Sequence, residues 1–180
     1  GTAAYLSQFA IINHTTEKKK MAIISKAVIP DIALLDPEVL VSMDPYLTAC
    51  TGVDALVHAV EAYVSLGAGH LTDLYARDAI ALIARSLPVS VERPDDLEAR
   101  MNMLLACMEA GLAFSNAGLG AVHALAHSLG GLLDLPHGEC NALLLPEVAR
   151  VNYSAASGRY DHIMQLMGIA ASGADAVAAA

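Results

Sequence analysis

Five polar side chains stand in segments of the sequence that are otherwise strongly apolar. Asp54 and His58 are four residues apart in a valine-rich segment, so a helix would present a carboxylate and an imidazole on one face, one turn apart. His123 and His127 share one face of a second apolar segment in the same way. His137 follows in a Pro-His-Gly sequence, a turn that could bring a further imidazole back over the end of this second segment.

The valine-rich surroundings imply burial, and a buried ionised Asp54 is costly unless a cation or several hydrogen-bond donors compensate it. Each pair alone has an ordinary explanation. An Asp/His pair at this spacing is more often a hydrogen bond on a helix surface, and the His-x-x-x-His pair has Ala124 where a zincin carries its general-base glutamate. One carboxylate with up to four imidazoles, however, is difficult to satisfy by hydrogen bonds alone. Together they predict a divalent transition metal with an open coordination position.

Glu61 lies two turns after Asp54, and two roles are open for it. Its carboxylate either contacts a metal ligand without binding the metal itself, or it is solvated or caps a helix. The remaining histidines lie in polar surroundings and are expected at the surface: His14, His70 and His162.

The elements that must position these residues change in type near residue 36. Before it, residues 6–13 and 21–24 are short, apolar, β-branched runs separated by a polar segment, which predicts two strands and a turn; residues 32–35 are a candidate third strand. After it, Asp36 and Asp44 each precede a proline, as N-cap residues do. Four helices are expected: around 53–64, around 74–87 with Pro88 as its limit, from 94–96 to about 114, and from about 118 onward.

The composition bounds the class of protein. The chain of 180 residues is 56% hydrophobic and has a net charge of −9, which excludes a disordered polymer and disfavours nucleic acid and anionic membranes as partners. No apolar run reaches the roughly eighteen residues that a membrane span needs, and residues 1–4 lack the pattern of a secretory signal. Three widely spaced cysteines fit reduced thiols, so a cytoplasmic location is expected. An opening strand pair and an alanine-rich end without a cap predict a piece of a larger protein.

Three segments closely resemble the iron-containing (group III) alcohol dehydrogenases, in that family's order and spacing. They are TGVDALVHAVEAY at 51–63, AFSNAGLGAVHALAHSLGG at 113–131 and PHGECNALLLP at 136–146, and the resemblance extends to about residue 152. It implies a mainly α chain, the helical metal-binding domain of a dehydroquinate synthase-like two-domain fold. Residues 1–36 would be remnant strands of the N-terminal α/β nucleotide-binding domain, and 37–180 an all-helical metal-binding domain truncated at its C-terminus.

The resemblance also implies roles for the polar side chains. The family's further active-site histidine, which lies close to substrate and cofactor without being a ligand, falls on His127. The family's four metal ligands fall on residues that the spacing had already singled out: Asp54, His58, His123 and His137.

The cofactor contacts implied by the resemblance lie at the start of the chain. Gly1 and Thr2 look like the beginning of the family's G-T-[AG]-[SA] loop, which lies near the nicotinamide, and are therefore the expected cofactor-binding residues. The chain departs from the family at residues 5–7, where Tyr-Leu-Ser replaces the usual acidic residue, aliphatic residue and Thr. The family's Gly-Gly-Gly-Ser phosphate-binding segment is absent.

The implied reaction is hydride transfer between a primary alcohol, or its aldehyde, and NAD or NADP at an Fe²⁺ or Zn²⁺ site. The implied partners are a small alcohol or aldehyde and further copies of the chain, as a homodimer or larger homo-oligomer. Three alternatives stay open at this point. They are a zinc-dependent, glycerol dehydrogenase-like enzyme, a mononuclear iron oxygenase that uses two histidines and a carboxylate, and a catalytically silent structural fragment without the cofactor domain.

Overall fold

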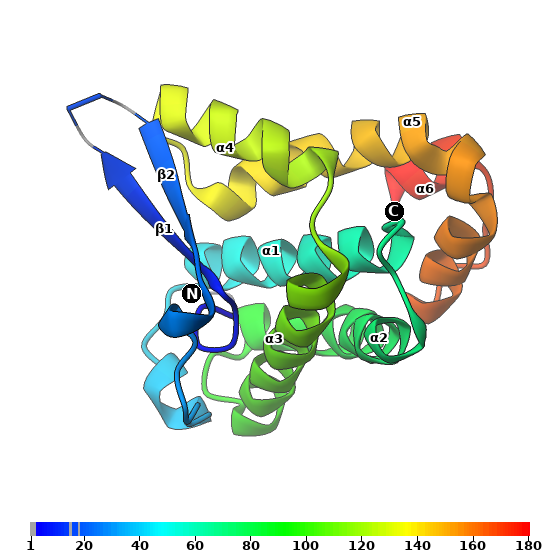
Figure 1. Cartoon of the computed structure of the whole chain (residues 1–180). Helices are drawn as coiled ribbons and strands as arrows, with labels where there is room; N and C mark the ends of the chain where they lie inside the picture. Colours follow the sequence, from blue (N-terminus) through cyan, green and yellow to red (C-terminus); the bar gives the residue numbers. More distant parts are fainter. Residues whose placement is uncertain (1–2, 15, 18) are drawn as a thin grey trace.

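The computed structural model describes residues 3–14, 16–17 and 19–180. A hairpin of two antiparallel strands comes first and is followed by helices: β1 (Phe9–His14), β2 (Lys19–Ile24), the short 3-10 helices η1 (Lys26–Val28) and η2 (Pro37–Leu40), α1 (Pro45–Val64), α2 (His70–Glu92), α3 (Leu97–Ala117), α4 (Ala121–Leu133), α5 (His137–Leu166) and α6 (Ala174–Ala179). Figure 1 shows α1 in the middle, between α4 with α5 on one side and α2 with α3 on the other, while the hairpin lies beside one end of α4.

Aspartates begin two of the long helices, as the sequence predicts. The Asp44 carboxylate accepts the Leu47 N–H at 3.0 Å at the start of α1, with proline as the first helical residue. Asp96 does the same for the Ala99 N–H at the start of α3. Asp36 caps only the short η2. These caps satisfy backbone donors that have no partner inside the helix.

The strands differ in extent from the prediction. The register runs from the Phe9–Ile24 pair to the His14–Lys19 pair. Both strands therefore extend closer to the turn than expected. The predicted strand at residues 32–35 is wrong: this segment is not in a strand, and Ile32 and Leu34 are 84% and 89% exposed. An apolar run becomes a strand only where a neighbour pairs with its backbone, and in the described part of the chain this segment has none.

Helix α2 continues past Pro88, which corrects the predicted end at that residue. The proline side chain lies on the exposed face of the helix, while Ser86 and Ser90 on the opposite side stay buried. Proline removes one backbone hydrogen bond. Because the buried face keeps its contacts with the neighbouring helices on both sides of the proline, tertiary packing carries the helix through.

Small residues let the helices approach α1 closely. The main core cluster contains Ala59, Ala62, Ala76 and other alanines from α1, α2 and α3, together with larger side chains such as Phe114. By length and composition, no single helix in the described residues could cross a membrane; α3 and α4 pass that test only as a pair, and they are bent by 105°.

Helices α5 and α1 approach closely at the start of α5, where Gly138 faces the backbone of α1. A Cβ atom added there would overlap the Cys50 carbonyl oxygen. Only a residue without a side chain therefore allows α5 to begin at this distance from α1.

We expect Gly138→Ala to lower the free energy of unfolding by about 1–3 kcal/mol or more, because the clash is with backbone that cannot rotate away. Gly158→Ala in the same helix is the matched control, since nothing lies within 4 Å of its added Cβ. It should be neutral or stabilising by up to about 1 kcal/mol, because alanine favours a helix over glycine. Urea denaturation of both variants measures the difference. Equal stability would contradict the close approach.

Candidate metal centre

Helices α1 and α4 bring three of the predicted ligands together in the interior. Asp54 and His58 come from one face of α1, and His123 comes from the first turn of α4. Their exposed fractions are 5%, 6% and 2%. One ligand atom from each lies within 4.8 Å of the other two, a spacing that fits coordination of a single metal ion.

His137 completes the group from a third helix. It is not in a turn but is the first residue of α5, after a loop that begins at Asp134 in a left-handed conformation (φ 56°). Its Nε2 lies 3.6 Å from Asp54 Oδ1, the same distance as His123 Nε2. Its side chain is 29% exposed, so it forms the solvent side of the cluster.

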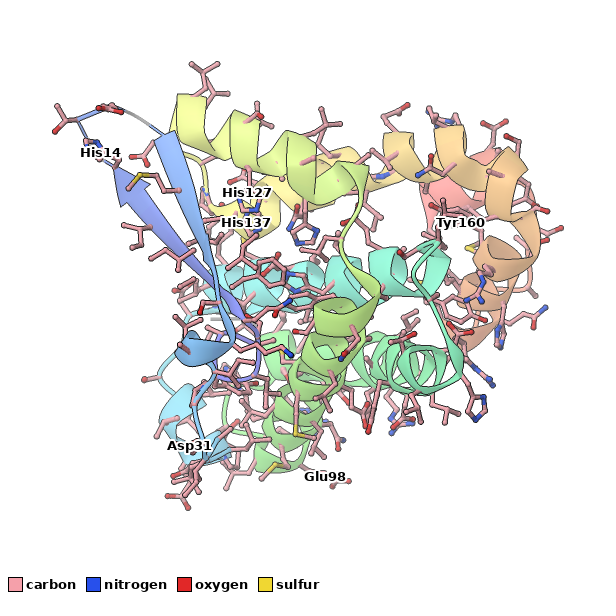
Figure 2. All side chains as sticks on the ribbon, viewed as in Figure 1. His14, Asp31, Glu98, His127, His137 and Tyr160 are labelled. Atoms are coloured by element: carbon pink, nitrogen blue, oxygen red, sulfur yellow. The ribbon has the colours of Figure 1, made fainter. Side chains whose placement is uncertain are left out.

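His127 lies one turn after His123 on α4, at the edge of the cluster. Its ring stacks on that of His137 with centroids 4.9 Å apart, and lies 6.4 Å from the ring of His123. Figure 2 shows His127 and His137 next to one another below α4. The structure therefore brings all five of the side chains singled out by the sequence to one cavity.

The His58 ring is held between two other rings. It stacks on Phe114 and on His123, each with centroids 4.4 Å apart. Burial lowers the pKa of His58 to about 4, although the charge of Asp54 acts in the opposite direction. At neutral pH this imidazole is therefore uncharged, which is the form that binds metals.

Glu61 is buried and makes contact with both His123 and the backbone of α4. Its Oε2 lies 2.6 Å from His123 Nδ1, and its Oε1 accepts the Val122 N–H at 2.7 Å. Burial alone would raise the pKa of Glu61, but hydrogen bonds from His123 and from the backbone of Gly120 and Val122 outweigh it and lower the pKa. Of the roles left open by the sequence, the helix-capping role is confirmed and the solvated one is wrong, because Glu61 is 5% exposed. The contact with His123 fits the role of partner of a metal ligand, which stays a prediction.

Asn141 is a site residue that the sequence analysis missed. It is fully buried, and its Nδ2 donates to Asp54 Oδ1 at 2.6 Å while lying 3.4 Å from Nε2 of both His123 and His137. The available signal was its position four residues after His137, which places both on one face of a helix. Burial works to lower the pKa of His123, but the carboxylates of Asp54 and Glu61, which accept hydrogen bonds from the ring, raise it overall.

A cavity of about 700 Å³ opens onto the cluster. Its inner end is formed by the four predicted ligands and His127. Its walls are formed by apolar side chains of the hairpin, α3 and the loop before α4, such as Ile11, Phe114 and Leu119. A carboxylate and imidazoles facing such a space fit a metal ion that keeps a position for a small ligand. The ligand roles themselves stay predictions. The predicted cofactor residues, Gly1 and Thr2, lie outside the described residues.

A comparison of this chain with models of known protein families shows to which family it belongs. A family model described as the Fe-containing alcohol dehydrogenase family, C-terminal, matches residues 48–180. The chain belongs to this family. The resemblance noted in the sequence is thereby confirmed, and so is the fold class, because the match is to the family's C-terminal, helical part.

Curated members of the iron-containing alcohol dehydrogenase family match nearly the whole chain. The 1,3-propanediol dehydrogenase of Klebsiella pneumoniae is 47% identical over 168 residues, which are 93% of this chain and 43% of that protein. The NAD-dependent methanol dehydrogenase of Bacillus methanolicus is 42% identical over 180 residues, which are 100% of this chain and 47% of that protein.

Solved structures agree with the fold. An alcohol dehydrogenase from Oenococcus oeni superposes with a TM-score of 0.93 at 41% identity, covering 99% of this chain and 48% of that one. A 1,3-propanediol oxidoreductase superposes with a TM-score of 0.91 at 44% identity, covering 99% and 47%. The chain therefore spans less than half the length of these family members.

We expect His123→Ala to abolish stoichiometric metal binding, because it removes a central imidazole and leaves two buried carboxylates without their shared partner. The loss should exceed the roughly 10- to 100-fold caused by removing outer partners of a ligand. Elemental analysis of anaerobically purified protein measures metal per chain. His70→Ala, at an exposed position in α2, is the matched control and should retain the metal. A His123→Ala protein with about one metal per chain would refute this assignment.

Proposed function

We propose that this chain supplies the metal-binding part of an iron-dependent alcohol dehydrogenase that transfers a hydride between a primary alcohol, or its aldehyde, and NAD or NADP. The observation that carries the proposal is the buried cluster of Asp54, His58, His123 and His137 at the inner end of an otherwise apolar cavity. The family members above support it, since they are named as dehydrogenases of small alcohols and one is named as NAD-dependent.

We also propose the domain division that the sequence analysis predicts. Residues 1–36, which include the hairpin, belong with the nucleotide-binding domain, and residues 37–180 form the metal-binding domain. The reaction would then take place in the cleft between the hairpin and the helices, where the cavity lies. The homodimer or larger assembly implied by the family stays a prediction.

Each residue of the proposed site has a defined task. A divalent metal held by the four ligands would act as a Lewis acid that makes the alcohol hydroxyl easier to deprotonate. Asp54 lowers the net charge of the site, and the imidazoles set its geometry. His127 is half-buried and lines the same cavity, so it is positioned to pass the hydroxyl proton to solvent. Apolar walls favour a short aliphatic alcohol over a charged one.

The test of this proposal combines metal analysis with an activity assay on the full-length protein that contains this chain. About one iron per chain, together with NAD(P)H formation that requires both the metal and a primary alcohol, is the expected result. If the protein contains about one zinc per chain and has the same activity, the proposed metal is wrong and the proposed reaction is kept. Metal binding without any alcohol-dependent reduction of NAD(P) would refute the dehydrogenase function.

We expect His127→Ala to keep its metal and to slow turnover by about 10²- to 10⁴-fold, the usual range for loss of a general acid or base. The reason is that His127 lies next to the predicted ligands without being one. The pH dependence of kcat is the decisive measurement, because removal of a proton relay must alter the profile. An unchanged profile, with metal retained, would count against the relay role.

A further inference from the structure

One carboxylate joins two elements of the site. Glu61, on α1, is 5% exposed, and its two oxygens make different contacts: Oε1 accepts the Val122 N–H at 2.7 Å, and Oε2 lies 2.6 Å from His123 Nδ1. The N-terminus of α4 has no cap of its own, since its N-cap residue is Gly120. Glu61 lies 62 positions before His123 in the sequence. Its side chain therefore both caps α4 and contacts His123, one of the predicted metal ligands.

Gly120 makes this contact possible. A Cβ atom added at Gly120 would lie 2.8 Å from Glu61 Oε1, closer than such an atom is tolerated. Glu61 and Gly120 also line a cavity of about 280 Å³ with mainly apolar walls. The position of the carboxylate therefore depends on the missing side chain at residue 120.

The contact determines which nitrogen of His123 carries the proton. An ionised carboxylate only accepts hydrogen bonds, so Nδ1 must donate to Glu61 and the lone pair of the neutral ring then lies on Nε2. That nitrogen faces Asp54, with Nε2 3.6 Å from Oδ1. The neutral ring is therefore already in the tautomer that a metal ligand needs.

We propose that Glu61 is a positioning residue that fixes His123 in its Nε2-binding tautomer and orientation and so sets the affinity of the site for its metal. This inference rests on the proposed function in one respect, that the cluster binds a metal. Glu61 does not touch the substrate or the metal. It acts through His123 and through the first turn of α4.

The Glu61→Gln variant keeps the shape of the side chain but changes which hydrogen bonds it can make with His123. The amide oxygen can still accept the Val122 N–H, but the NH₂ group then faces His123 Nδ1 and can only donate to it. With the amide in this orientation, the proton of the ring moves to Nε2, the nitrogen that should bind the metal. We expect the fold to be kept and the affinity for Zn²⁺, measured by competition with a chelator, to fall by about 10- to 100-fold.

Two further variants test the route of this effect. Glu98→Gln removes the same charge at an exposed position of α3, far from the cluster (Figure 2), and should leave Zn²⁺ affinity unchanged. Gly120→Ala changes neither a charge nor a predicted ligand, but the added Cβ should displace the Glu61 carboxylate and lower the affinity in the same direction as Glu61→Gln.

The tautomer is read directly by ¹⁵N NMR of the metal-free protein at a pH where the imidazole is neutral. We expect the proton of His123 on Nδ1 in the original chain and in Glu98→Gln, and on Nε2 in Glu61→Gln. A proton on Nε2 in the original chain, or Zn²⁺ affinity of Glu61→Gln equal to that of Glu98→Gln, would overturn the inference. An original chain that binds no Zn²⁺ or iron would refute the proposed function instead, and the NMR result would still decide the control of the tautomer.

Discussion

Two carboxylates buried on one helix, Asp54 and Glu61, are the constraint on which the rest of the structure depends. Each is only 5% exposed, and a charge that has left water must be compensated by donors or by a cation. Asn141 donates to Asp54, and the backbone of α4 together with His123 compensates Glu61. His123 lies between both carboxylates and so belongs to both sets of contacts.

This constraint explains the arrangement of the helices around α1. Helix α4 begins against Glu61 and α5 begins with His137, whose Nε2 is 3.6 Å from Asp54 Oδ1, so both helices begin near the negative charges. Such ends carry partial positive charge and favour anions nearby. Close approach is possible because of Gly120 and Gly138, which leave no side chain between the helices.

The sequence predicted helices and strands correctly where the residues that determine them are close together in the chain. Asp44 and Asp96 cap helices as expected, because an aspartate and the backbone it satisfies are only three residues apart. The prediction was wrong where distant contacts decide the structure. Residues 32–35 have the pattern of a strand without a partner, and α2 passes Pro88 because its other face remains buried.

For the candidate site, the sequence by itself determined which side chains share a helix face, since the period of the helix fixes the spacing of Asp54 with His58 and of His123 with His127. It left Glu61 between two roles and gave Asn141 none. Only the tertiary structure decided that Glu61 contacts His123 and that Asn141 donates to Asp54, contacts between residues 62 and 87 positions apart. The physical reason is that contacts within a helix follow from its geometry, whereas contacts between helices depend on how closely their buried faces can pack.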